Sequence, residues 1–213
     1  MLKTTQSRFI ALISLFFIVL VIVTLIVIQV FIAPQLKQTE TNLVANQVDD
    51  VAVAINDRLN KVESQVRTIT QTVAQMDSDS IDRLLPALVD QYGDAAVFGG
   101  GIWPLPNQRD PAKIKFSTFF ARNNNNELTV NTFWNSAESP NYFEQSWYMA
   151  ASKGEKGQCV WAPAYFDDAS TQPRTNCAMP IYKGDKQWGV ATIDVTLGFF
   201  NQLVTGMEKK VNA

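Results

Sequence analysis

The chain has 213 residues, enough for one to two domains at roughly 150 residues per domain. Its 18 Lys and Arg residues against 20 Asp and Glu residues give a formal net charge of −2, so we expect no nucleic-acid partner. With no histidine and only 2 cysteines, the sequence excludes a Ser-His-Asp triad, a Cys-His pair and a His-ligated or four-cysteine metal site, and we expect neither metal nor cofactor.

Residues 9–32 are predicted to form a transmembrane helix. The run Phe9–Ile28 carries no charge, and about 20 apolar residues span the hydrocarbon core of a membrane as a helix. A cleaved signal peptide is the alternative. Its apolar region would stop after about 7–15 residues at a small-residue cleavage site, whereas this run continues to Ile32.

The charges that flank the span predict its orientation. Lys3 and Arg8 lie in residues 1–8, whereas only Lys37 follows closely after the span. The positive-inside rule therefore places residues 1–8 in the cytoplasm and the remainder outside, which in a bacterium is the periplasm. We expect a protein of the bacterial inner membrane with a single span in this chain.

Residues 35–77 are predicted to form a long membrane-proximal helix. The stretch to Met76 contains neither Gly nor Pro, and apolar residues recur in it at steps of three and four. Some forty residues at the rise of an α-helix extend about 60 Å. Because the spacing is close to a heptad, we expect the membrane-proximal half to pair with a second copy in a homodimer. Packing of the helix on its own domain alone is the alternative.

Residues 78–200 are predicted to form an α+β module around one antiparallel sheet. Asp79 or Ser80 should cap a second helix from Ile81 to about Tyr92, in which Pro86 should cause a kink or a later start. Further on, short β-branched and aromatic runs alternate with turn clusters, as is typical of strands. The expected strands are 97–103 with a bend or bulge at its glycines, 115–122, 127–131, 158–162, 174–182 and 187–196. A short helix is expected near 144–153, and residues 201–213 should belong to a C-terminal helix that begins near Leu197.

Cys159 and Cys177 lie on neighbouring predicted strands of the segment expected outside the membrane, where a disulfide is the usual state. The bond would close a loop of roughly 18 residues and stabilise the fold by about 3 kcal/mol in the chain-entropy model. A redox-active pair is the alternative, but the two cysteines do not form a CxxC motif.

Residues 142–194 contain a spaced set of aromatic, acidic and turn residues. It consists of Trp147-Tyr148, the segment Trp161-Ala-Pro-Ala-Tyr165-Phe-Asp167, then Thr175 and Pro180, and Gly189-Val-Ala-Thr-Ile-Asp194. This set resembles the pattern of the extracytoplasmic double Cache sensor family, the PAS-like domains of chemoreceptors, histidine kinases and diguanylate cyclases. The family has W-x-x-P-Y-x-D where this chain has its proline one place earlier.

The resemblance implies a fold and an organisation. The chain would be the N-terminal span, long helix and membrane-distal PAS-like module of a receptor whose membrane-proximal module and cytoplasmic output domain are absent here. The expected function is ligand sensing, not catalysis, with the signal passing through the long helix to the span.

The resemblance also implies a ligand site. The amino-acid-binding branch of the family has an Arg two residues before the Trp that holds the ligand carboxylate, and Gln145 stands at that position here. An aromatic wall with two carboxylates suits a cation, and a branch without the Arg recognises amines. We therefore expect a small amine or other ammonium ligand. The expected ligand-binding residues are Gln145, Trp147, Tyr148, Trp161, Tyr165, Asp167 and Asp194.

Other interpretations of these residues remain open. Trp147 and Trp161 could be core residues, and Asp194 could serve a structural hydrogen bond. Asp167 could instead form a turn.

Other functions also remain open. Arg109, Arg122 or Arg174 could supply a replacement cation, which would make the domain an amino-acid or carboxylate sensor. Asp167 and Asp194 could form a glycosidase-type carboxylate pair. A membrane-anchored protein that binds a partner and no small ligand is the remaining alternative.

Overall fold

The structure is a computed structural model that describes residues 5–166, 173–201 and 205. The chain divides into two compact units, Met1–Val53 and Ala54–Ala213, which are described separately.

The first unit is helical. It contains α1 (Thr5–Val27), the π-helical turn η1 (Ile28–Ile32) and the start of α2 (Ala33–Ala74). The described helix that starts at Ser7 is apolar and long enough to cross a membrane. Pro34, which lies between the ranges expected for the span and for the long helix, is the second residue of α2. The π-helical turn ends two residues before it, and such a turn is a common local rearrangement where a helix bends.

In the second unit, the end of α2 and helix α3 (Ser78–Asp90) supply apolar faces to the core. The N-cap of α3 is Asp77, whereas the sequence predicted Asp79 or Ser80. The Asp77 carboxylate accepts a hydrogen bond of 2.9 Å from the backbone N–H of Ser80, three residues along, which is the usual geometry of a cap. With this cap the helix starts before Pro86, which lies inside it.

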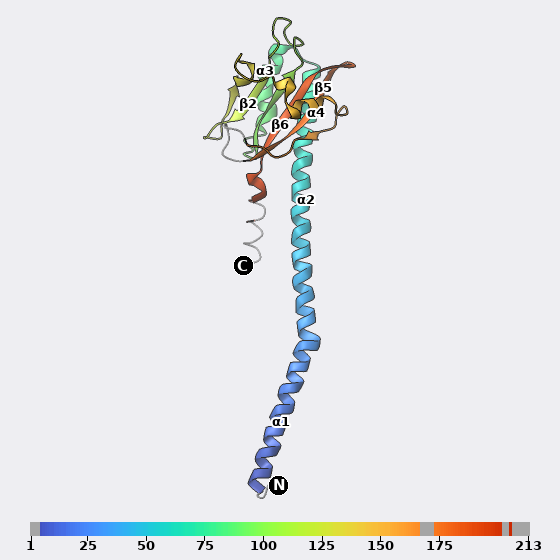
Figure 1. Cartoon of the computed structure of the whole chain (residues 1–213), viewed down its shortest axis with the longest axis vertical. Coiled ribbons are helices and arrows are strands. Elements are labelled where there is room, and N and C mark those ends of the chain that lie inside the picture. Colours follow the sequence, from blue (N-terminus) through green and yellow to red (C-terminus); the bar gives the residue numbers. More distant parts are fainter. Residues whose placement is uncertain (1–4, 167–172, 202–204, 206–213) are drawn as a thin grey trace. The chain divides into compact units, whose positions relative to one another are not determined.

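The sheet is antiparallel and has six strands in the order β3-β2-β1-β6-β5-β4, which confirms the predicted α+β class (Figure 1). The expected bulge lies in β1, between Val97 and Gly99. The strands are β1 (Val97–Pro104), β2 (Thr118–Arg122), β3 (Leu128–Asn131), β4 (Val160–Trp161), β5 (Arg174–Lys183) and β6 (Lys186–Thr196). Most of the expected C-terminal helix lies outside the described residues. In the part of it that is described, residues 198–201 are helical.

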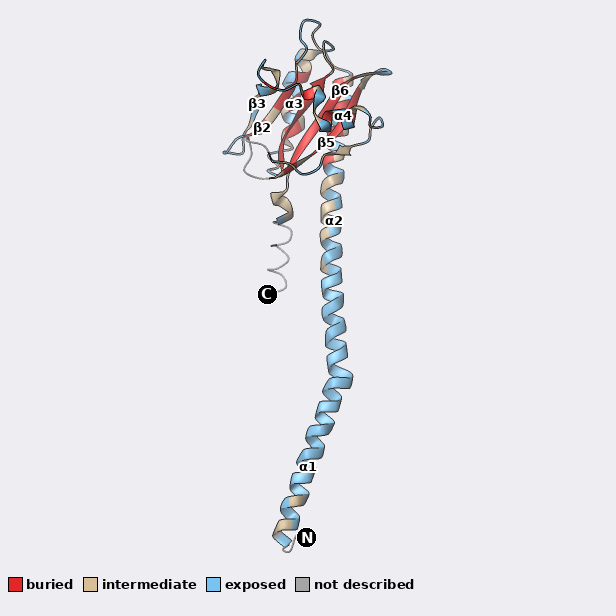
Figure 2. Ribbon diagram, viewed as in Figure 1, coloured by how far each residue is buried: buried red, intermediate tan, exposed pale blue. Residues whose placement is uncertain are grey.

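Each face of the sheet carries a separate hydrophobic cluster, and the buried residues concentrate on its strands (Figure 2). One cluster joins the sheet to α2 and α3, and the other joins it to α4 (Ser146–Ser152) and the turns η2 (Phe133–Asn135) and η3 (Tyr142–Glu144). Side chains of β6 alternate between them: Ile193 packs against the two long helices, whereas Val190 packs towards α4.

Candidate ligand-binding site

A cavity of about 390 Å³ lies on the α4 face of the sheet. Aromatic side chains form much of its wall, namely Trp103, Phe119, Trp134, Trp147 and Tyr165. Its polar side chains are Gln145, Ser146, Asn176, Thr192 and Asp194. The segment after β4 closes one side with Ala162, Pro163 and Ala164.

The polar floor of the cavity comes from two paired strands. Asn176 of β5 lies opposite Asp194 of β6, and both side chains are buried, with 3% and 6% exposure. The Tyr165 hydroxyl donates a hydrogen bond of 2.9 Å to Asp194 Oδ2. The same hydroxyl accepts one of 3.4 Å from Asn176 Nδ2. Three side chains from three segments therefore form one network.

Burial controls the ionisation of this network. Burial raises the pKa of Asp194 to about 6, although the nearby Arg174 charge and the Tyr165 hydrogen bond act in the opposite direction. Burial and the Asp194 charge raise the pKa of the Tyr165 hydroxyl well above its usual range. At neutral pH the cavity therefore holds an ionised carboxylate beside a neutral phenol that donates to it.

The aromatic wall is built around Trp103 of β1. Its ring centroid lies 5.1 Å from that of Trp147, 5.2 Å from that of Phe119 and 5.9 Å from that of Trp134. Its indole Nε1 donates a hydrogen bond of 2.9 Å to the Thr192 hydroxyl on β6. These contacts fix the mutual arrangement of the aromatic rings that line the cavity, and aromatic rings are known partners of bound cations.

Four of the predicted site residues line the cavity: Gln145, Trp147, Tyr165 and Asp194. Tyr148 is instead buried in the hydrophobic cluster beneath α4, because the residue after Trp147 on a helix points in another direction. Trp161 packs on the opposite face of the sheet, because side chains alternate along β4. Asp167 lies outside the described residues.

The sequence interpretation missed Trp103, Phe119, Trp134, Asn176 and Thr192. Thr192 could have been found, because it lies two residues before Asp194 and so shares its face of the strand. Asn176 could not have been found in this way. The turn at Lys183–Lys186 sets the pairing of β5 with β6, and a bulge at Ile181–Tyr182 then shifts that pairing by one residue. Trp134 follows β3 in a 3-10 turn, which the sequence pattern did not indicate.

Two of the three arginines considered as replacement cations are engaged elsewhere. Arg109 pairs with Asp82, and Arg122 pairs with Asp90. Arg174 is buried, with its guanidinium carbon 3.8 Å from the Phe98 ring centroid and 5.6 Å from that of Tyr165. Arg174 is thus near the cavity, but is not among the described residues that line it.

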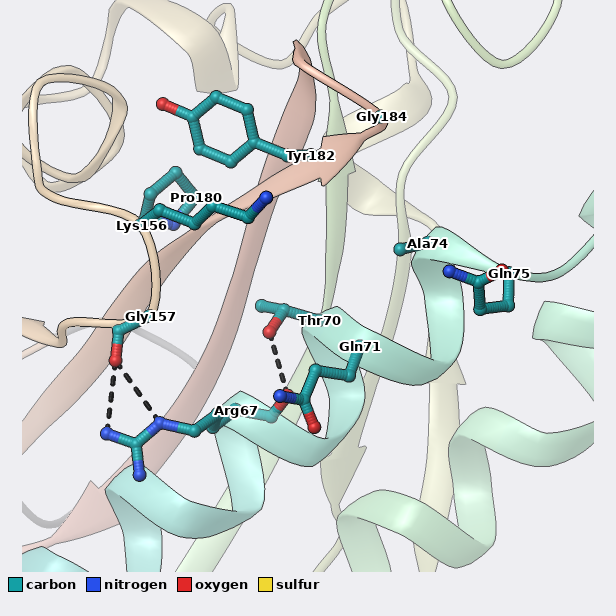
Figure 3. A pocket seen from close by; sticks show the side chains of 10 residues that line it. All are labelled: Arg67, Thr70, Gln71, Ala74, Gln75, Lys156, Gly157, Pro180, Tyr182 and Gly184. Carbon is teal, nitrogen blue, oxygen red and sulfur yellow. Dashed lines mark hydrogen bonds between the residues drawn. The ribbon is translucent and has the colours of Figure 1, made fainter.

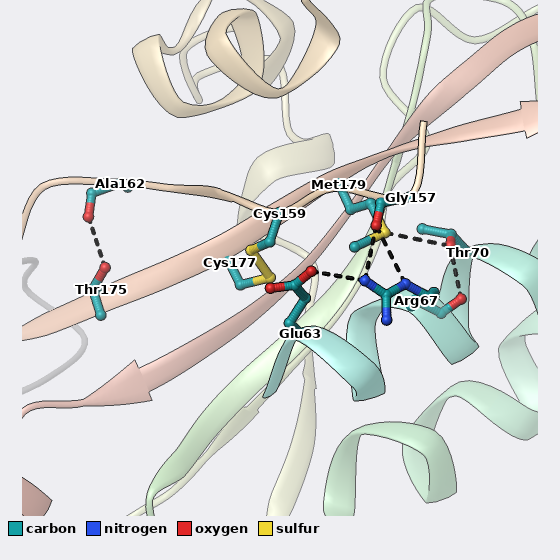
Figure 4. Close-up of a disulfide and its surroundings, with 9 residues drawn as sticks. All are labelled: Glu63, Arg67, Thr70, Gly157, Cys159, Ala162, Thr175, Cys177 and Met179. Carbon is teal, nitrogen blue, oxygen red and sulfur yellow. Dashed lines mark hydrogen bonds and ion pairs between the residues drawn. A yellow bond between two sulfur atoms is a disulfide. The ribbon is translucent and has the colours of Figure 1, made fainter. Parts of the chain in front are cut away.

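The segment 162–165, which forms part of the cavity wall, is bound to β5 at both of its ends. Before it, a disulfide joins Cys159 to Cys177, with their Cα atoms 5.5 Å apart (Figure 4). Within it, the Thr175 hydroxyl donates a hydrogen bond of 2.7 Å to the Ala162 carbonyl. At its end, Tyr165 and Arg174 exchange two backbone hydrogen bonds. The disulfide therefore anchors the chain to β5 just before the cavity wall begins, and hydrogen bonds hold the wall itself.

A second cavity, of about 320 Å³, lies between α2 and β5 on the other face of the sheet (Figure 3). Its Arg67 is already paired with Glu63 and donates to the Gly157 carbonyl. None of its described lining residues leaves a buried polar side-chain atom unpaired, so it offers less to a ligand than the aromatic cavity. The described residues also contain no cluster of three metal-ligating side chains.

An antiparallel sheet with a long N-terminal helix and an aromatic, acidic cavity on one face defines a PAS-like sensor module. The sequence profile of the methyl-accepting chemotaxis protein-like, first PDC sensor domain matches residues 86–202. The chain belongs to this family, which confirms the predicted Cache-type sensor; such a domain is not itself catalytic. No curated protein sequence matches the chain.

Solved structures share the fold. The chemoreceptor "Methyl-accepting Chemotaxis protein X" is 17% identical with a TM-score of 0.64, over 78% of this chain and 65% of that chain. The Campylobacter jejuni Tlp3 sensory domain with isoleucine bound is 15% identical and has a TM-score of 0.58. This match covers 82% of this chain and 66% of the Tlp3 chain. The Pseudomonas aeruginosa PctC ligand-binding domain in complex with GABA is 15% identical and has a TM-score of 0.53. This match covers 76% of this chain and 66% of the PctC chain. The chain thus spans about two thirds of these solved chains.

Proposed function

We propose that this chain is the sensing region of a transmembrane receptor and that it binds a small ammonium compound in the aromatic cavity. One observation carries this proposal: Asp194 is the one charged side chain among the described residues that line the cavity, and five aromatic side chains line the same cavity.

The energetics favour a cation over an anion. Each well-placed ring attracts a cation by about 0.5–2 kcal/mol, and a charge-assisted hydrogen bond to Asp194 adds to this. Gln145 cannot replace the bidentate, charged grip of an Arg on a carboxylate. A ligand with only negative charge would meet the ionised Asp194 and no lining cation.

An amino acid is the second candidate, favoured by the solved structures that hold isoleucine and GABA. Both compounds carry an ammonium group, for which Asp194 is the natural partner. Their carboxylate would need Gln145, Ser146 or a rearranged Arg174.

Matched ligand pairs distinguish the two candidates. We would titrate the full chain in nanodiscs with amino acids and with the amines that lack only their carboxylate, such as valine and isobutylamine, or ornithine and putrescine. Binding of the amines that Asp194→Ala abolishes supports the ammonium proposal. Binding of the amino acids alone favours the second candidate. A folded chain that binds neither series contradicts both and favours a partner-binding protein.

We further propose an arrangement in the membrane. Residues 1–8 lie in the cytoplasm, residues 9–32 cross the bacterial inner membrane, and the module at 78–200 senses in the periplasm. Two copies pair through the membrane-proximal part of the helix over residues 35–77. A ligand that binds one conformation of the module more tightly would shift the population of that conformation, and the helix would carry the change to the span.

A further inference from the structure

The Tyr165 hydroxyl determines which way the Asn176 amide faces. A phenol carries one proton, and that of Tyr165 is donated to Asp194 Oδ2 at 2.9 Å. Towards Asn176 the hydroxyl can therefore only accept, so the amide nitrogen must face it, at 3.4 Å. Hydrogen-bond partners are the proper basis for assigning an amide orientation. Asn176 Oδ1 is consequently turned away from Tyr165.

Asn176 Oδ1 has no hydrogen-bond partner among the residues that the structure describes. Its side chain is buried, with 3% exposure, and lines the cavity next to Asp194 on the paired strand. An unpaired buried acceptor is costly, and native structures contain few of them. A donor supplied by the ligand would satisfy this atom.

We propose that Asn176 Oδ1 and the Asp194 carboxylate together accept N–H donors from one ligand ammonium, so that the site selects a primary over a quaternary ammonium. This inference rests on the proposed function of the same cavity. A quaternary ammonium could still lie against the aromatic wall. It has no N–H to donate, however, so it would leave Asn176 Oδ1 unpaired and gain no hydrogen bond from Asp194.

The test compares amines with their N,N,N-trimethyl derivatives, for example isobutylamine, phenethylamine and putrescine. Binding to the full chain in nanodiscs is measured by calorimetry at neutral pH. We expect the chain to prefer the primary amines by roughly 10- to 100-fold, the usual effect of a hydrogen bond to a charged group. Asn176→Leu should reduce this preference by weakening the primary amines, although the hydrogen bond to Asp194 keeps part of it. Asn176→Asp keeps an acceptor and should preserve the preference. Asn125→Leu, in the exposed loop between β2 and β3, should change neither series.

The outcomes separate this inference from the proposed function. Equal or tighter binding of the trimethyl series, unchanged in Asn176→Leu, would overturn the role of Asn176 while the ammonium proposal stands. Absence of binding in both series, with a folded chain, would overturn both. If Asn176→Leu does not fold, Asn176→Asp decides: loss of the preference for primary amines in that variant would also overturn the inference.

Discussion

At the scale of single residues, the ionisation of Asp194 links ligand binding to pH. Burial raises its pKa to about 6, so the carboxylate becomes protonated as the pH falls through that value. A neutral acid attracts an ammonium weakly. We therefore expect ammonium affinity to be constant near neutral pH and to fall about tenfold per pH unit below about 6. Calorimetry between about pH 5 and pH 8 measures this. The weak residual binding of Asp194→Asn should not vary with pH over this range, and a wild-type profile equally flat would contradict the assignment.

The ionised form of Asp194 should also lower the free energy of unfolding. Because the folded-state pKa of Asp194 lies above its ordinary value of 3.8, the folded chain binds this proton more tightly than the unfolded chain does. Its contribution to the free energy of unfolding is present below about pH 4 and is lost as the pH rises to about 6. A difference of roughly two pKa units corresponds to about 3 kcal/mol. Asp194→Asn keeps an acceptor for Tyr165 without the charge, so we expect it to melt higher than wild type near pH 8 but to bind no ammonium tightly. A lower melting temperature than wild type there would show that the ionised form stabilises the fold.

The sequence predicted only some of the side chains that line the cavity. Tyr165 and Asp194 were named through the resemblance to the Cache pattern, and both line the cavity; Asp194 also ends an apolar run of the sequence. Tyr148 and Trp161 match the family pattern equally well, yet each points into a hydrophobic cluster. Which face a side chain takes depends on where a helix starts and on strand register. The β-bulge that brings Asn176 opposite Asp194 has no signature in composition or spacing.

At the scale of elements, the Cys159–Cys177 disulfide joins the residue directly before β4 to β5. Replacing both cysteines by serine should lower the free energy of unfolding by about 3 kcal/mol. For a chain of this size that corresponds to a fall in melting temperature of roughly 6–12 °C. Ligand affinity should also fall, because the chain loses its anchor just before the wall formed by residues 162–165. A reductant should lower both the melting temperature and the ligand affinity of the wild type, and should change neither in the double variant. Unchanged affinity after reduction would show that the disulfide does not support the ligand site.

Gly100 of β1 lets helix α3 and strand β6 approach closely. A Cβ added at Gly100 would lie 2.8 Å from the Thr192 carbonyl and 3.2 Å from Val89 on α3. A backbone atom cannot move aside as a side chain can, so Gly100→Ala should destabilise the fold by about 1–3 kcal/mol, the typical cost of overpacking. Thermal or denaturant unfolding measures this. Val130→Ala, at an exposed position of β3, is the control and should change stability little. A Gly100→Ala variant as stable as wild type would mean that both β6 and α3 can shift to make room for the methyl group.

The elements themselves were largely predictable from periodicity. The strands β1, β5 and β6 fall near the expected ranges because each is a long apolar run bounded by turn residues. The errors lie at helix ends and short strands. Asp77 caps α3 in place of Asp79 or Ser80, and β4 has two residues where five were expected. At such places tertiary contacts outweigh local preference, and one sequence does not reveal them.

At the scale of the whole molecule, the membrane-proximal helix carries apolar side chains that are exposed in the described part of the chain. Val44 and Val48 are 58% and 61% exposed, and they are spaced as in a heptad. If two copies pair along this stripe, a cysteine at Val48 should form an intermolecular disulfide in native membranes under mild oxidation. The natural cysteines are already joined to each other, so they do not interfere. A cysteine at Asp50, two residues further on and therefore on another side of the helix, is the control and should cross-link poorly. Equal cross-linking at both positions would indicate random collision, and none at either would indicate that the helices do not pair here.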